Sequence, residues 1–135
     1  CPSRTYLRQA APLTTLQDLA SHSVMAYSWW SGGDVWQLED ALGGHHQVTT
    51  YPRLHANSGD TCRAAALADQ GVIFQPAFLV GDDIRQGRLM RILPDLHGPR
   101  IAIHVVYPSR KHLPGKVRAM ADFLAAAFQT PAWNL

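Results

Sequence analysis

The sequence has few of the features that mark several large classes of protein. None of its apolar runs approaches the roughly 20 residues that a membrane-spanning helix needs. The formal net charge is only +2 over 135 residues, and the basic residues are scattered, which argues against nucleic-acid binding by this segment. It contains no internal repeat and no low-complexity segment. With 47% hydrophobic residues, it is typical of a globular domain that buries a substantial core.

Cysteine is scarce as well. Cys1 and Cys62 lie far apart and form no CxxC pair, which argues against a structural disulfide and favours a reducing cytoplasm. Cys62 lies in an alanine-rich segment, where a small buried thiol is the simplest interpretation. The sequence begins at Cys1 without a methionine or a charged-then-apolar leader. We expect a truncated product, although removal of a signal peptide would also leave such a start.

Signatures of catalysis are missing too. There is no GxSxG, phosphate-binding loop, dinucleotide fingerprint or HExxH motif. The residues that could carry metal or acid–base chemistry are four histidines and one carboxylate pair: His45, His46, His55 and His97, with Asp82 and Asp83. Adjacent histidines on a strand point to opposite faces, and adjacent aspartates on a helix do not face each other. We therefore predict no enzyme, no metal site and no cofactor.

Helical and extended patterns alternate along the chain, which predicts an α/β fold. Helices are expected at residues 16–20, 60–70, 76–85 and 114–129. Extended segments are expected at residues 24–27, 35–39, 47–51, 53–56, 72–75, 88–93 and 101–107. Residues 3–10 are expected to form a loop and a turn. The clearest strand is 101–107, which places four apolar residues on one face: Ile101, Ile103, Val105 and Tyr107.

The most informative stretch is Asn57-Ser58-Gly59-Asp60, followed by an alanine-rich run that leads through Gly71 into a short strand ending at Pro76. Small polar residues of this kind cap a helix. The free N–H groups and the dipole of a helix start suit anions or small polar ligands. Asp60 already supplies negative charge there, which argues against a strongly anionic ligand group. These residues could also serve only to cap the helix, and that role is compatible with ligand binding. The stretch as a whole favours a small-molecule-binding domain.

Four segments occur in an order and spacing that together are fairly specific. They are Pro2, Tyr6-Leu7, Pro12, Asp18-Leu19 and His22; Asn57 to Asp60 with the alanine run and Gly71-Val72 to Pro76; Gly87-Arg88-Leu89 with Ile92-Leu93-Pro94; and Tyr107-Pro108-Ser109-Arg110 with Lys116-Val117-Arg118 and Asp122-Phe123-Leu124. With these segments the chain resembles the effector-binding domain of LysR-type transcriptional regulators. It departs from the family at Asp69, where a glycine is common, and at Ile73 and Gln75.

The resemblance implies a Rossmann-like α/β fold of the type II periplasmic-binding-protein class. Residues 1–107 would be the second subdomain, and residues 108–135 the closing segment and helix that normally pack on the first. The implied function is effector sensing in the bacterial cytoplasm, with transcription controlled by ligand-dependent rearrangement of a regulator oligomer. DNA would be bound only through a winged helix-turn-helix that is absent from this sequence.

The resemblance also implies which residues bind. The wall of the effector cleft would be Ser28, Trp29, Trp30, Ser58, Gly59, Gln75 and Pro76. Core packing is the competing interpretation for one of the tryptophans. A homo-oligomer, with a dimer expected, would form through the alanine-rich helix at Cys62, Ala65, Ala66 and Asp69, or through an apolar stripe on the last helix at Val117, Met120, Leu124 and Phe128.

Two other functions remain as alternatives. A periplasmic solute-binding protein has a related two-lobed fold, and a secretion signal upstream of Cys1 would favour it. A metal-assisted hydrolase built on the histidines is the enzymatic alternative, and stoichiometric metal in the purified chain would favour that.

Overall fold

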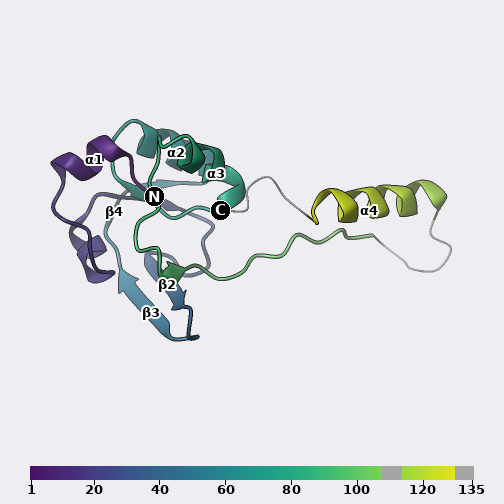
Figure 1. Cartoon of the computed structure of the whole chain (residues 1–135), viewed down its shortest axis with the longest axis horizontal. Helices are drawn as coiled ribbons and strands as arrows, with labels where there is room; N and C mark the ends of the chain where they lie inside the picture. Colours follow the sequence, from purple (N-terminus) through teal and green to yellow (C-terminus); the bar gives the residue numbers. More distant parts are fainter. Residues whose placement is uncertain (108–113, 130–135) are drawn as a thin grey trace.

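The computed structural model describes residues 1–107 and 114–129, and it combines helices with strands along the chain (Figure 1). In chain order they are α1 (Arg4–Gln9), the 3-10 helix η1 (Gln17–Ser21), β1 (Val24–Tyr27), β2 (Val35–Asp40), β3 (His45–Thr49), β4 (Pro52–Ala56), α2 (Gly59–Leu67), β5 (Val72–Ile73), α3 (Ala77–Arg85), β6 (Leu96–His97) and α4 (Gly115–Ala127). The α/β class predicted from the sequence is confirmed.

The strands form two small sheets. The first is parallel, in the order β4-β1-β5. Its central strand β1 is almost continuously buried, as expected for a strand covered on both faces. The second is antiparallel, in the order β3-β2-β6. Along β2, Trp36 and Leu38 are buried while Gln37 between them is exposed, so that this sheet turns one face to the core.

Alternate residues of the parallel sheet enter two different apolar clusters. Val24 and Val72 pack with Trp36, Leu38 and neighbouring side chains of the antiparallel sheet. Their neighbours Met25 and Ile73 face the opposite way and pack with residues of α2 and α3, namely Cys62, Ala66 and Val80, and with Leu89. Each such large side chain contributes about 1.5–3 kcal/mol when fully buried. The parallel sheet is therefore the layer that joins the helices to the hairpin.

Several sequence predictions are wrong at the level of local structure. Residues 4–9 form a helix rather than a loop, because the Ser3 side chain accepts the Tyr6 N–H at 3.0 Å and caps α1. Residues 101–107 form no strand, and Ile101 and Ile103 are 61% and 60% exposed. Their β-branched pattern favours extended backbone, but a strand also needs a neighbour to pair with. The described residues supply none there.

Helix α2 ends at Leu67, three residues before the predicted end at Gln70. Asp69 follows with φ of 62°, the left-handed conformation in which a helix commonly ends and which glycine adopts without strain. The Ser3 hydroxyl donates to the Asp69 carboxylate at 2.5 Å. This bond holds the aspartate at a position where the family resemblance predicts glycine.

The titration of Asp40, in the β2–β3 hairpin, is expected to depend on its hydrogen bonds. Asp40 accepts hydrogen bonds from the His46 ring and from the N–H groups of Leu42 and Gly44. These bonds, the one from His46 first, lower the pKa of Asp40 to about 2. A carboxyl group whose pKa is lowered by folding stabilises the folded state at pH values above its ordinary pKa of about 3.9. That stabilisation is lost as the pH falls through the lowered pKa. The amide shifts of Leu42 and Gly44 should therefore titrate with a midpoint well below about 3.9. A midpoint at the ordinary aspartate value would contradict this.

Candidate functional site

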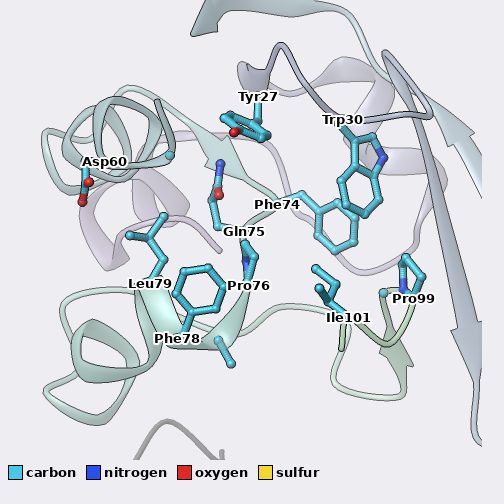
Figure 2. A pocket seen from close by; sticks show the side chains of 13 residues that line it. Tyr27, Trp30, Asp60, Phe74, Gln75, Pro76, Phe78, Leu79, Pro99 and Ile101 are labelled. Carbon is cyan, nitrogen blue, oxygen red and sulfur yellow. The ribbon is translucent and has the colours of Figure 1, made fainter. Parts of the chain in front are cut away.

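The chain contains a pocket of about 550 Å³ between the beginnings of α2 and α3 (Figure 2). Ligand pockets in proteins usually measure roughly 300–1,000 Å³. Its lining residues are Tyr27, Trp30, Gly59, Asp60, Phe74, Gln75, Pro76, Ala77, Phe78, Leu79, Gly98, Pro99 and Ile101. Most of these side chains are apolar or aromatic, which is the usual composition of a small-molecule site.

The parallel sheet explains why these residues meet. Tyr27 is the last residue of β1, Gly59 opens α2 shortly after β4 ends, and residues 74–76 lead from β5 into α3. The carboxyl ends of all three parallel strands therefore reach the pocket. Ligands of open α/β sheets bind at this edge. The sequence predicted Pro76 as the first residue of α3, whereas it is the residue just before that helix.

Phe74 anchors one wall of the pocket. Its ring centroid lies 5.2 Å from that of Trp30 in an edge-on arrangement and 5.1 Å from that of Trp36. A Cβ at Gly98 would lie 2.5 Å from the tip of the Phe74 ring, so only glycine allows this close approach. Packing from three sides therefore fixes the orientation of the ring.

Gln75 stands near the centre of the lining, with the rings of Trp30 and Phe74 on one side and Leu79 and Asp60 on the other (Figure 2). Its Nε2 is buried and has no hydrogen-bond partner among the described residues. The amide also acts on the buried Cys62 thiol, where it opposes the rise in pKa that burial causes. A thiol sulfur is only a weak acceptor, so Gln75 keeps hydrogen-bonding capacity for another group.

Four of the predicted ligand residues line the pocket: Trp30, Gly59, Gln75 and Pro76. The other three lie outside the lining. Ser28 is exposed, Trp29 is 76% exposed, and Ser58 caps α2 by accepting the Thr61 N–H at 3.4 Å. Sequence reasoning missed Tyr27 and Phe74. Each stands at or next to the carboxyl end of a predicted parallel strand, which was the available signal.

The predicted oligomer residues of α2 divide between the core and the surface. Cys62 and Ala66 are fully buried within this chain, where they contact its own sheet rather than a partner. Ala65 is half-buried and Asp69 is exposed. The outward face of α2 is instead formed by four exposed residues: Asp60, Thr61, Ala64 and Ala68.

Helix α4 lies apart from the sheets (Figure 1) and has no buried residue. Of its predicted apolar stripe, Met120 is 57% exposed and Phe128 is 42% exposed, while Val117 and Leu124 are half-buried. Phe123, beside the stripe, is 65% exposed. A helix surface this apolar needs further covering.

The histidines do not gather into one site. His46 and His55 each lie 2.8 Å from a different carboxylate, those of Asp40 and Asp34. His45 lies 3.6 Å from Glu39. Within the described part of the chain, no group of three or more histidine, cysteine, aspartate or glutamate residues could hold a metal ion.

The two carboxylates of the adjacent pair, Asp82 and Asp83, also lie in different environments. Asp82 is exposed and pairs with Arg85. Asp83 is fully buried and pairs with Arg63 and Arg88. No helix among the described residues has the length and apolar character needed to cross a membrane.

Comparisons with known proteins agree on one family. The model of the LysR substrate binding domain matches residues 1–129. YhjC of Escherichia coli, an HTH-type transcriptional regulator, is 28% identical over 130 residues, which cover 96% of this chain and 44% of YhjC. PtxR of Pseudomonas aeruginosa, also an HTH-type transcriptional regulator, is 33% identical over 119 residues, which cover 88% of this chain and 38% of PtxR.

A solved structure gives the same answer. The regulatory domain of AphB from Vibrio vulnificus matches with a TM-score of 0.77 and 27% identity, over 93% of this chain and 61% of that one. The chain spans less than half the length of the two curated relatives.

Proposed function

The chain belongs to the LysR substrate binding domain family, and we propose that it is the effector-sensing part of a bacterial transcriptional regulator. The observation that supports this most is the pocket of about 550 Å³ at the shared carboxyl edge of three parallel strands. In this proposal a small molecule binds there, and Trp30, Gly59, Gln75 and Pro76 contact it. Ser28, Trp29 and Ser58 lie outside the lining, and we assign them no contact.

The mechanism we propose is a ligand-biased equilibrium. Residues 1–107 form one wall of the effector cleft. A first subdomain forms the other wall, and the closing segment of residues 108–135 packs on that subdomain. A ligand that binds the closed arrangement better than the open one shifts the population between them. The relatives are HTH-type regulators, so the change would reach DNA through such a domain in the cytoplasm. We assign no catalytic step to this chain.

The pocket can be tested by filling it. In Gly59→Val, the new side chain would enter the pocket, because even a Cβ there lies 2.7 Å from the Leu79 side chain and 3.1 Å from the Gln75 amide oxygen. Both neighbours are side-chain atoms that can move, so the fold should survive. Gly115→Val is the matched control, since Gly115 also opens a helix and has open space around it.

The measurement is a screen of small metabolites by amide chemical shifts of the labelled chain. We expect ligands whose shifts centre on the pocket, with affinity unchanged in Gly115→Val and at least about tenfold weaker in Gly59→Val. Ligands that bind Gly59→Val as tightly as the unchanged chain would contradict the proposed site.

We also propose that the chain forms a homo-oligomer, with a dimer expected, through the outward face of α2. Ala64 is exposed at the middle of that face, whereas the neighbouring Ala66 is buried in the core. Ala64→Glu would place like charges together across a two-fold interface without disturbing the core. We expect sedimentation equilibrium to show at least about tenfold weaker association. An unchanged association constant would exclude this face and leave α4 as the candidate.

A further inference from the structure

The lining of the pocket indicates the charge of its ligand. We propose that the group bound against this wall is an uncharged aromatic ring that carries a hydrogen-bond acceptor such as a carbonyl oxygen, and not a carboxylate. This inference rests on the proposed function, since it concerns the same pocket. It follows from three properties of the lining, namely its charge, its rings and its hydrogen-bonding groups.

The charge of the lining opposes an anion. Among the described residues that line the pocket, none is lysine, arginine or histidine, and Asp60 is the one carboxylate. Arg63, one turn further along α2, directs both Nε and Nη2 to the buried Asp83 at 2.5 and 3.0 Å. The guanidinium of Arg63 is therefore already paired with Asp83. A carboxylate entering the pocket would meet the Asp60 charge, and no cationic side chain among the described lining residues would compensate for its lost hydration.

The two helix beginnings oppose a cation in turn. Both α2 and α3 direct their first N–H groups toward this region, since Gly59, Ala77 and Phe78 all line the pocket. At α3 there is no acidic residue in the first turn and no side-chain cap. No acidic side chain in that turn therefore offsets the positive end of the helix dipole. A partly negative oxygen on an uncharged ligand interacts favourably with this positive potential and avoids the repulsion that a carboxylate would meet from Asp60.

The rings favour a planar aromatic partner. Trp30 and Phe74 form an edge-on pair at 5.2 Å, and Tyr27 and Phe78 complete the aromatic part of the lining. Phe78 is 58% exposed. Aromatic rings prefer offset-stacked and edge-on contacts with one another. An aromatic ligand gains such contacts from several sides.

The uncharged polar groups suit an acceptor. Tyr27 provides a hydroxyl and Gln75 an amide, and the amide nitrogen is buried without a partner among the described residues. A half-turn about the last torsion of Gln75 would exchange its nitrogen and oxygen. The oxygen would then face the Cys62 sulfur, whose S–H donates to the Ala26 carbonyl oxygen at 3.6 Å, and the N–H₂ would face the Gly59 side of the pocket. A ligand carbonyl there would satisfy a donor that the protein leaves unpaired.

Three probes that share one ring test this charge class: benzamide, benzoate and benzylammonium. Each is titrated at about pH 7 into the labelled chain, and dissociation constants are taken from the amide shifts and from the side-chain N–H signals of Trp30 and Gln75. We expect benzamide to bind at least tenfold more tightly than either charged probe. We expect Asp60→Asn to strengthen benzoate binding several-fold and so to narrow the preference for benzamide over benzoate. Asp82→Asn, at an exposed aspartate outside the lining, is the matched control and should change neither.

The outcomes separate this inference from the proposed function. If benzoate or benzylammonium binds at the pocket as tightly as benzamide, the charge class is overturned while the pocket remains a ligand site. If Asp60→Asn leaves benzoate binding unchanged, the charge argument is overturned in the same way. If none of the probes shifts the signals of the lining residues, both the inference and the proposed pocket are overturned.

Discussion

Replacing Asp83 with alanine is expected to lower the free energy of unfolding by about 3 kcal/mol, the lower end of the range for breaking a buried ion pair. The carboxylate is fully buried and accepts from Arg63 at 2.5 and 3.0 Å and from Arg88 at 2.6 Å. These bonds tie α2 to the end of α3. Both arginines are partly exposed, so their charges regain water after the substitution, which keeps the loss at the lower end.

Asp82→Ala is the control for this prediction. Asp82 precedes Asp83 directly, but its side chain is 72% exposed and pairs with Arg85 in the same helix. Exposed pairs of this kind contribute about 0–1 kcal/mol. Urea unfolding of both variants should therefore separate them by about 2 kcal/mol or more. Equal midpoints for the two variants would show that the Asp83 cluster does not hold the helices together.

Gly71→Ala is expected to destabilise the chain by about 3 kcal/mol or more, through a combination of backbone strain and steric clash. Gly71 has φ of 150°, and a Cβ there would lie 2.1 Å from the carbonyl oxygen of Ser23. The same oxygen accepts the Val72 N–H at 2.8 Å, at the start of the β1–β5 pairing. Backbone cannot move aside here without loosening the central strands of the parallel sheet.

Gly33→Ala isolates the strain from the clash. Gly33 has φ of 59°, and a Cβ added there would meet no atom within 4 Å, so alanine would bear only the left-handed penalty of about 1 kcal/mol. Thermal or urea unfolding should rank Gly71→Ala well below Gly33→Ala in stability. A similar loss for both variants would contradict the clash at Ser23.

The sequence predicted most of the helices and strands because the sequence patterns that mark them are local. Val24 to Tyr27 has an extended pattern, and the stretch from Asn57 to Asp60 offers small polar residues that cap a helix. Both predictions are confirmed. The segment 101–107 failed for the opposite reason. Its alternation favours extended backbone, but strand formation depends on a pairing partner, which the local sequence does not encode.

The site was only partly predictable for the same reason. The family resemblance implied Gly59 and Gln75, and both agree with the rule that ligands bind at the carboxyl ends of parallel strands. Trp29 does not follow, because the turn after β1 directs neighbouring residues differently. Trp30 packs against Phe74, whereas Trp29 remains in solvent. Adjacent tryptophans cannot be told apart by composition, and only the packing of the turn decides between them.

The exposed apolar helix α4 fits a chain that spans 44% and 38% of its two relatives. In our proposal a first subdomain covers α4 and closes the second wall of the pocket. We therefore propose that this chain is one part of a DNA-binding regulator.

The measurement that tests this claim most directly is the coding sequence in frame immediately upstream of the Cys1 codon. We expect it to encode a winged helix-turn-helix, a long linker helix and an α/β half-domain. A signal peptide followed by the first lobe of a solute-binding protein would contradict it, and the link from the pocket to transcription would then have to be abandoned.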